Sequence, residues 1–177
     1  MTSSVAPDLW AAIAREAVRE SSLWADALRR DPEHEPVFSP LGEERFALGL
    51  ETIYEGYLVH YGRPRLFAPS DEDTALLLGD YLYAHGLVRI AQFGDVDAVA
   101  DLSELISLCS QLRAEHADGD GALWAASAAL LGQDALDGPR SALRLHGDAA
   151  ALDATARARA GDAAVDRSLA VHAGRVR

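Results

Sequence analysis

The stretch from residue 71 to residue 94 contains the feature that most constrains the fold, which is a long run with almost no fixed charge. Between Asp73 and Arg89 the only fixed charge is Asp80. The apolar side chains of this run lie nearly all round a helical wheel: Leu76, Leu77, Leu78, Tyr81, Leu82, Tyr83, Leu87, Val88 and Ile90. A helix of this kind is surrounded by other elements rather than lying on a surface. We therefore expect the 71–94 helix at the centre of an all-helical domain.

Helical periodicity recurs on both sides of this segment. Further helices are expected over residues 8–30, 42–61, 95–117, 122–131, 139–159 and 161–173. Proline and glycine separate them, and no stretch alternates as a half-buried strand does. The expected fold is all-α, with about six to seven helices around the central apolar helix. We expect one domain over residues 1–177, an ordered core at about 8–172 and a frayed end at Gly174–Arg177.

Length and composition exclude several classes of protein. A chain of 177 residues is long enough to bury a sizeable core. It contains no run of about 18 apolar residues, so no membrane span is expected. The segment Met1–Pro7 lacks the basic and apolar regions of a signal peptide, and a cytoplasmic location follows as the default. The single cysteine, Cys109, excludes an internal disulfide, and its place in an apolar pattern predicts a buried, inert thiol.

The charge balance excludes further functions. The net charge is −12, and all sixteen basic residues are arginines. A chain this acidic repels phosphates, so we expect neither nucleic-acid binding nor attraction to an anionic membrane. Without lysine there is no Schiff-base chemistry.

Two neighbouring motifs resemble those of the trans-isoprenyl diphosphate (polyprenyl) synthases. Gly62-Arg63-Pro64-Arg65 precedes the run A-L-L-L-G-D-Y-L-Y-A at residues 75–84. The family signature reads G-R-P-T followed by A-x-L-L-G-D-Y-L-x-A, in the same order. Residues 50–60 look like the family helix that ends in L-V-H, and a weaker likeness continues to about Leu152. The resemblance implies a shortened helical bundle of the isoprenoid synthase type.

The chain departs from the family at the motifs that carry its chemistry. Family members continue from L-V-H into D-D-x-x-D, whereas His60 is followed here by Tyr61 and Gly62. The second aspartate motif is replaced by alanines and arginines over residues 153–162. In the family these carboxylates hold the magnesium ions that neutralise a diphosphate leaving group. We therefore expect no metal site and no cofactor, with magnesium only if a rewired active site exists.

These departures favour a catalytically inactive protein that acts as a partner or regulatory subunit through helix–helix association. The resemblance implies a homodimer or a heterodimer with a catalytic prenyl synthase. Aromatic residues are enriched in interfaces, and the candidates here are Tyr54, Tyr57, Tyr81 and Tyr83. One alternative is a protein that binds an apolar ligand, such as an isoprenoid or another lipid. The second is a rewired transferase or lyase acting on isoprenoid diphosphates.

Under the two alternatives, the ligand-binding candidates are Arg63, Arg65, Tyr57 and Tyr81. The arginines suit a phosphate, although solvation or pairing with local carboxylates also accounts for them. The candidates for proton transfer are Asp80, His85 and His60. The structural interpretation of these residues is a buried, hydrogen-bonded Asp80 and a pair of core histidines across two helices.

Two acidic groups allow a metal interpretation. Asp97, Asp101 and Glu104 have the spacing of one helix row, but the apolar stripe of the same helix places them on the outer side. Asp118 and Asp120 resemble a fragment of a calcium loop, but the residues that follow supply no further acidic ligands. We expect neither group to bind a metal.

Overall fold

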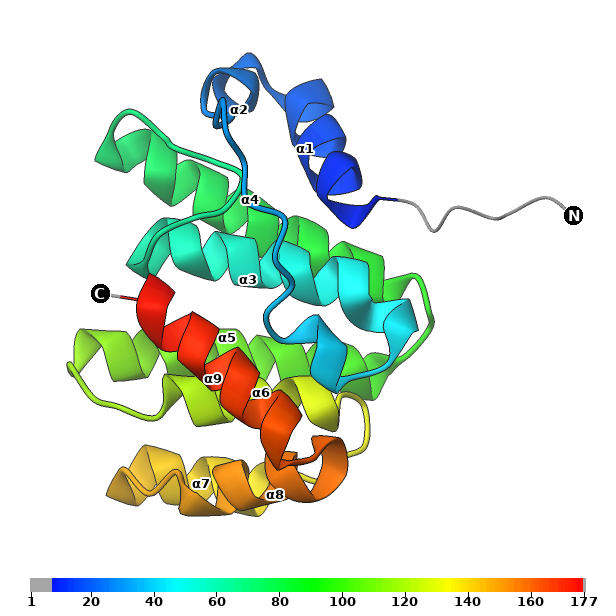
Figure 1. The fold of residues 1–177 in the computed structure, drawn as a ribbon, viewed down its shortest axis with the longest axis vertical. Coiled ribbons are helices and arrows are strands. Elements are labelled where there is room, and N and C mark those ends of the chain that lie inside the picture. The colour runs from blue at the N-terminus through cyan, green and yellow to red at the C-terminus, as the bar shows by residue number, and fades with distance from the viewer. Residues whose placement is uncertain (1–7, 177) are drawn as a thin grey trace, which may run out of the picture.

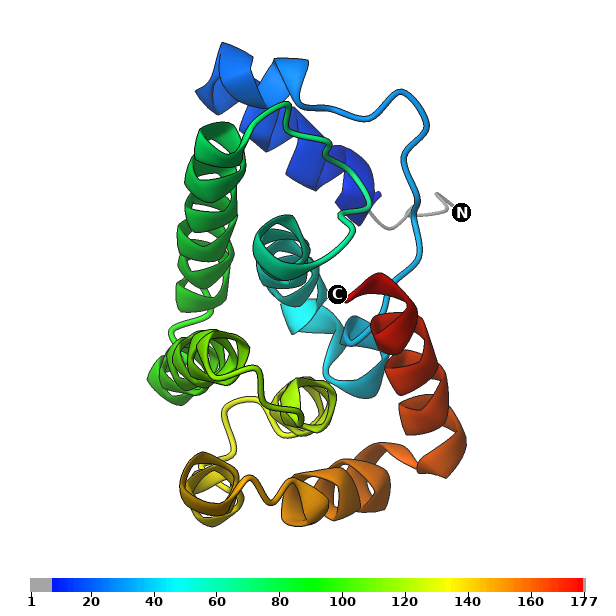
Figure 2. The same cartoon turned by 90° about the vertical axis from the view of Figure 1, so that its left-hand side faces the viewer.

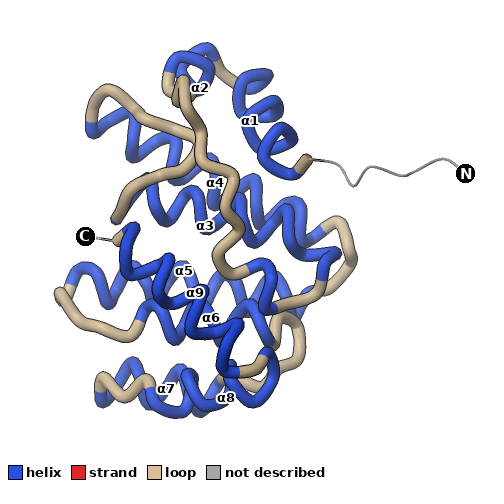
Figure 3. Tube along the Cα trace, viewed as in Figure 1, coloured by secondary structure: helices blue, strands red, loops and turns tan. Residues whose placement is uncertain are grey.

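The computed structural model describes residues 8–176, so Met1–Pro7 and Arg177 lie outside the described residues. Within that range the chain is helical, with isolated bridges but no strand (Figures 1 and 3). The first helices are α1 (Leu9–Glu20), α2 (Ser22–Asp26), η1 (Ser39–Leu41), η2 (Glu44–Phe46), α3 (Ala47–Tyr61) and α4 (Glu72–Ala91). The later ones are α5 (Val96–Ala114), α6 (Asp120–Ala129), α7 (Asp137–His146), α8 (Ala150–Ala160) and α9 (Asp162–Arg175). The predicted all-helical class is confirmed, but residues 8–176 form nine α-helices rather than the six to seven expected, because some predicted helices are interrupted.

Helix α3 lies in the middle of the arrangement (Figure 2). Helix α4 forms one edge, α9 lies on the opposite side, and α7 and α8 close one end. Helices α1 and α2 close the other end, and the long loop at residues 27–38 runs from α2 across α3 to η1 (Figures 1 and 3). This loop and α9 together cover the side of α3 that faces away from α4.

Several helix boundaries differ from those predicted. The 8–30 helix is interrupted at Ser21, whose extended backbone ends α1 and whose hydroxyl accepts from Leu23 N to cap α2. The 139–159 helix is interrupted at Gly147, which has a φ of 67° and ends α7. At the C-terminus, α9 continues to Arg175, which is buried, so the expectation of fraying from Gly174 is wrong.

The central, surrounded helix is α3 and not α4. Every residue of α3 from Gly49 to Val59 is buried. In α4, by contrast, Leu76, Leu77 and Val88 are 56%, 55% and 54% exposed. The expectation that the 71–94 helix is covered all round is therefore wrong. Apolar residues do occupy every side of α4, but neighbouring elements cover only some of those sides.

A seam of glycines explains why α3 and α4 approach so closely. Gly49 and Gly56 of α3 face Gly79 and Gly86 of α4. A β-carbon on Gly49 would stand 2.5 Å from a methyl carbon of Ile90, and one on Gly86 would stand 3.0 Å from the carbonyl oxygen of Gly49. The backbones therefore meet without intervening side chains. This contact places the end of α3, with His60, directly against α4.

Two apolar cores share these two helices. The larger core joins α3 to α5, α6, α8 and α9 and contains the buried aromatic residues Phe38, Tyr54, Tyr57 and Trp124. The smaller core packs α1 and α2 onto the other side of α3 and α4 through Trp10, Ile13, Ala17 and Trp24. Because α3 and α4 contribute to both cores, the two ends of the chain pack on one scaffold.

Candidate functional site

Asp80 and His60 form a contact at the edge of the glycine seam. His60 Nε2 lies 3.3 Å from Asp80 Oδ1, but the Asp80 side chain is 66% exposed. The expectation of a buried Asp80 is wrong, because its side chain reaches His60 only at the edge of the contact between α3 and α4 and is otherwise open to solvent. Burial lowers the pKa of His60, although the charge of Asp80 acts in the opposite direction. At neutral pH this pair is thus a neutral imidazole beside a solvated carboxylate.

His85 has different partners, so the expected pair of core histidines does not form. His85 Nε2 lies 2.6 Å from Glu16 Oε2, and Arg89 Nη2 donates to the same oxygen at 2.6 Å. A shallow pocket of about 260 Å³ lies beside His85 and is also lined by Tyr81. Tyr81 stacks on His85 with ring centroids 5.2 Å apart. The contact with Glu16 ties α1 to α4.

Arg65 lies inside the protein rather than in a solvated loop. Its Nη1 donates to Glu51 Oε2 at 2.5 Å and its Nε donates to Glu55 Oε2 at 3.0 Å, and all three side chains are fully buried. The remaining oxygen of Glu51 accepts from the backbone of Val37 and Ser39. Pairing with carboxylates, one of the two structural interpretations of Arg65, is therefore the one observed. Its donors are used internally, which corrects its place among the ligand-binding candidates.

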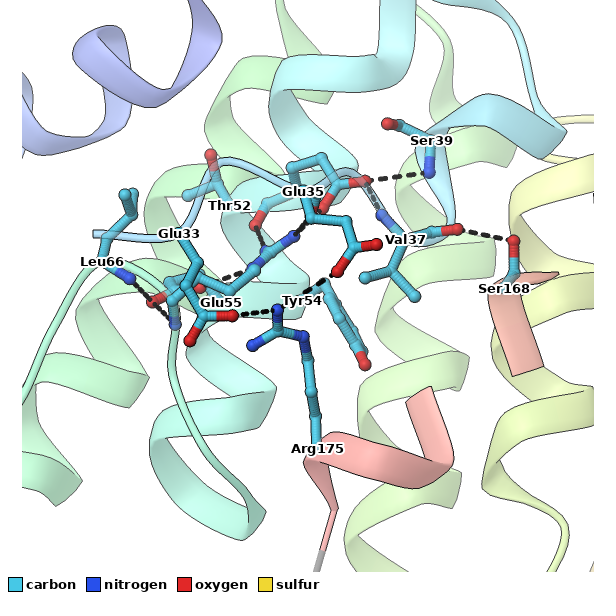
Figure 4. Close-up of polar contacts among 12 residues, drawn as sticks. Glu33, Glu35, Val37, Ser39, Thr52, Tyr54, Glu55, Leu66, Ser168 and Arg175 are labelled. Atoms are coloured by element: carbon cyan, nitrogen blue, oxygen red, sulfur yellow. Dashed lines mark hydrogen bonds and ion pairs between the residues drawn. The ribbon is translucent and has the colours of Figure 1, made fainter. Parts of the chain in front are cut away.

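Helix α9 packs over this cluster through polar side chains. Arg175 reaches Glu33 Oε2 at 2.7 Å and Glu35 Oε2 at 3.4 Å, as Figure 4 shows. Two turns earlier, the Ser168 hydroxyl donates to the Val37 carbonyl at 2.6 Å. These contacts fasten α9 to the loop that crosses α3, and they belong to the fold rather than to a ligand site.

Arg63 has a different environment from Arg65. It lines a pocket of about 380 Å³ together with Arg29, Asp71 and Glu72. Its backbone N–H donates to the Arg175 carbonyl at 2.8 Å, which ties the loop after α3 to the end of α9. The two acidic residues in the lining balance the two arginines, so the pocket has no net formal charge.

A second buried polar network lies between α3, α5, α6 and α9. Tyr57 donates to Asp120 Oδ2, and Arg113 Nε donates to the Tyr57 hydroxyl at 2.7 Å. Arg113 also pairs directly with Asp120. His172 Nε2 lies 3.1 Å from the same Asp120 oxygen, and His172 Nδ1 lies 2.9 Å from the Tyr54 hydroxyl.

The electrostatics of this network favour an ionised Asp120. Burial alone would raise the pKa of Asp120, but hydrogen bonds from His172 and Tyr57 and the charge of Arg113 outweigh it and lower that pKa. Burial raises the pKa of the Tyr57 hydroxyl well above its ordinary value. Tyr57 is therefore neutral and inaccessible, and it cannot serve as the ligand-binding residue that the sequence suggested.

A pocket of about 490 Å³ opens beside the outer end of this network. Its lining includes Tyr61, Ser110, Arg113, His116 and Asp118. Sequence reasoning missed Arg113 and His172 and treated Asp120 only as a fragment of a calcium loop. No local signal joins them, because His172 follows Asp120 by 52 residues and Tyr54 by 118.

The tyrosines proposed for an interface are mostly interior residues. Tyr54 and Tyr57 are fully buried, and Tyr83 is 9% exposed. Tyr81 is partly buried against Trp24 and His85. The first three therefore cannot contact a partner without opening the core.

The most prominent exposed feature is an apolar row on the outer side of α4. We name it the α4 stripe and define it by the exposed residues Leu77, Ala84, Val88 and Ala91. They recur at i, i+7, i+11 and i+14 and so share one side of the helix. Leu76 precedes the stripe, and two further exposed apolar residues, Phe93 and Val96, follow α4 in the sequence. Helix α4 lies at the edge of the described chain, with no other helix on its outer side (Figure 2).

The acidic row on α5 is split between surface and interior. Asp97 and Glu104 are exposed as predicted. Asp101 is buried, accepts from Arg140 Nη1 at 2.7 Å and also accepts from the backbone of Gly132, so its predicted outer position is wrong. Among residues 8–176, no group of three or more histidine, cysteine or acidic residues is placed to hold a metal ion. Cys109 is buried, as predicted.

Comparison of the chain with protein-family models, with curated proteins and with solved structures found no match. Among the described helices, none combines the length and apolar character that a membrane crossing requires. The likeness to the polyprenyl synthases therefore depends on the sequence motifs alone.

Proposed function

We propose that this chain is a catalytically inactive protein on an isoprenoid-synthase-like helical scaffold, and that it acts as a partner or regulatory subunit through helix–helix association. The observation that carries this proposal is the α4 stripe. It offers an exposed apolar row, interrupted by Asp80, on a chain whose net charge is −12.

The stripe needs an explanation because α4 already has a buried side. Leu78, Leu82 and Ile90 face the cores and are at most 1% exposed. Leu77 and Val88, on the opposite side, are more than half exposed. Contiguous exposed apolar residues commonly mark a surface that another protein covers. A second apolar side on one helix therefore supports association through α4.

The environment of the expected catalytic end supports the absence of synthase chemistry. The end of α3 carries His60, Tyr61 and Gly62 in place of an aspartate motif. Two buried carboxylates near this end, Glu55 and Asp120, are already paired with Arg65 and Arg113. Magnesium-dependent diphosphate chemistry needs several carboxylates that converge on the metal.

The apolar-ligand alternative has less support. In the middle of the larger core, Trp124 lies 5.0 Å from Tyr54 and 5.5 Å from Phe38, measured between ring centroids. Aromatic side chains thus occupy the space that a ligand tunnel would need. The rewired-enzyme alternative retains one supporting observation, which is the pocket beside Arg113.

The association proposal is tested with the double variant Leu77→Ser, Val88→Ser. Sedimentation velocity is measured on the chain alone and mixed with a full-length prenyl synthase encoded in the same genome. The unmodified chain is expected to form a homodimer or a complex with the synthase, and the double variant is expected to remain monomeric. The control is Leu145→Ser, which removes a comparably exposed leucine from α7. Assembly that is equal in all three proteins, or absent in all three, would overturn the proposal.

The inactivity proposal has its own assay. The chain is incubated with magnesium and labelled allylic and homoallylic diphosphates, and chain elongation is measured. No elongated product is expected from the protein alone. Elongation by the purified chain would reject this part of the proposal and leave the association test unaffected.

A further inference from the structure

The fixed charges on the exposed side of α4 all have the same sign. Asp73 and Asp80 lie one helical turn before and after Leu77, and both are exposed. The single arginine of α4, Arg89, is 7% exposed and pairs with Glu16 on α1. The α4 stripe is therefore an apolar row with one carboxylate, Asp73, before its first residue and another, Asp80, between Leu77 and Ala84.

The same sign continues where the stripe meets α5. Asp97 is exposed and follows Val96, the most exposed apolar residue of this surface. Arg45, which contacts Asp95 at this end of α4, pairs with both Glu43 at 2.9 Å and Asp95 at 3.3 Å. Two carboxylates thus offset this one positive charge.

The histidines near the stripe leave this acidic character in place at neutral pH. His60 contacts Asp80, but burial lowers its pKa, so the imidazole is neutral and the Asp80 charge remains. His85 contacts Glu16 rather than either aspartate of the stripe.

We infer that the α4 stripe docks an amphipathic helix of a different protein, in which arginine or lysine flanks an apolar row. This inference rests on the proposed function and narrows its partner. The stripe covers the 15 residues from Leu77 to Ala91, and the rise between its ends is about 21 Å, or four turns of a facing helix. Arginine or lysine on that helix would pair with Asp73 and Asp80, in the manner of other helix recognition surfaces.

Charge argues against a second copy of this chain as the occupant. Two copies docked through α4 would bring Asp73 and Asp80 of one chain toward the carboxylates of the other. Each chain also carries a net charge of −12. Like charges brought together across an interface oppose association. A basic partner would instead associate faster, and its charge pairs would fix how the two helices align.

The test uses three designed peptides of about 18 residues, long enough for about five helical turns. Two carry leucine at i, i+4, i+7 and i+11, with arginine at the flanking positions in one and glutamate in the other. The third has the composition of the arginine peptide in scrambled order. Binding to the full chain is measured by fluorescence anisotropy at physiological salt. The amphipathic arginine peptide is expected to bind at least about tenfold more tightly than the other two.

Variants of the chain locate the binding. Leu77→Ser with Val88→Ser is expected to weaken binding of the arginine peptide at least about tenfold. Asp73→Asn with Asp80→Asn is expected to reduce the difference in binding affinity between the arginine peptide and the glutamate peptide. The controls are Leu145→Ser and Asp162→Asn, both at exposed positions away from α4.

The contrary outcomes distinguish a failure of this inference from a failure of the proposed function. Equal binding of the arginine and glutamate peptides, both lost in the leucine–valine variant, overturns the inference and leaves the proposed function standing. Tight binding of the scrambled arginine peptide also overturns it, because the attraction is then unspecific. Binding of no peptide overturns it as well, and the sedimentation experiment then decides whether the proposed function fails too.

Discussion

Gly56 of α3 lies directly against Gly79 of α4. A β-carbon on Gly56 would stand 3.0 Å from the Gly79 carbonyl oxygen. Glycine inside a helix costs about 1 kcal/mol relative to alanine. The close approach of the two backbones offsets this cost through many dispersion contacts and weak C–H···O contacts. The seam is therefore a structural reason for glycine at these positions.

Replacing Gly56 with alanine is expected to lower the free energy of unfolding by about 1–3 kcal/mol, because the added methyl group forces α3 and α4 apart. Chemical denaturation followed by circular dichroism measures the change. Gly174→Ala is the control, since Gly174 lies in α9 with open space where its β-carbon would be. That control is expected to be neutral or stabilising by up to about 1 kcal/mol. A larger loss for Gly174→Ala than for Gly56→Ala would contradict the seam.

Removing Glu51 is expected to destabilise the fold strongly. Glu51→Ala leaves Arg65 with one carboxylate partner and leaves the backbone N–H groups of Val37 and Ser39 without an acceptor. Breaking a buried ion pair from one side costs about 3–5 kcal/mol. Glu104→Ala is the matched control, because its pair with Arg144 is exposed and contributes at most about 1 kcal/mol. Equal effects of the two substitutions on denaturation midpoints would refute the buried cluster.

Stability is expected to depend on Asp120 in acid. The folded-state pKa of Asp120 lies below its unfolded value. Its contribution is therefore complete above the unfolded pKa of about 3.9 and is lost as the pH falls below about 4. Asp120→Asn is expected to lower stability at neutral pH and to flatten the decline in acid. Denaturation of both proteins is measured from about pH 5 to pH 2. Glu16 and Glu33 also have lowered pKa values, so some slope remains in the variant. If stability declined with falling pH in parallel for the two proteins, Asp120 would not be a source of the acid dependence.

Cys109 is expected to be unreactive in the folded protein. Its thiol is fully buried, and burial raises its pKa well above the ordinary value. The thiolate is the reactive form, so a chromogenic disulfide reagent should modify Cys109 only as the protein unfolds. Leu145→Cys supplies an exposed thiol as the control, and it is expected to react at once. Rapid modification of Cys109 in the native protein would show that the core opens locally.

Substitutions in the α4 stripe are expected to leave the fold intact. Leu77→Ser and Val88→Ser remove exposed side chains, and such changes usually alter stability by no more than about 0.5 kcal/mol. Leu78→Ser is the contrasting variant, because Leu78 is fully buried beside Leu77 in sequence. Its loss is expected to cost more than about 2 kcal/mol. A similar melting temperature for Leu77→Ser and Leu78→Ser would show that the side of α4 facing solvent is misassigned.

The sequence alone determined the local features of this protein. Helical spacing of apolar residues predicts helices at most of their observed places, and Cys109 lies in the interior that its apolar surroundings indicate. Local rules suffice for these features, because a helix is stabilised by contacts between residues three and four positions apart. The missed interruptions at Ser21 and Gly147 show where a local pattern runs past a break in the backbone.

Only the tertiary structure decided which sides of the helices are covered and where the charges lie. The apolar residues of α4 look alike in sequence, yet Leu78 is buried and Leu77 is exposed, because α3 packs on one side of α4 only. Asp80 is exposed for the same reason, whereas Asp101 of α5 is buried because Arg140 of α7 and the backbone of Gly132 pack against it. Arg65 reaches Glu51 and Glu55 across a turn, and His172 reaches Tyr54 across 118 positions. A buried charge or hydrogen-bonding group must find a partner wherever the chain brings one, and that partner is fixed by packing rather than by spacing along the sequence.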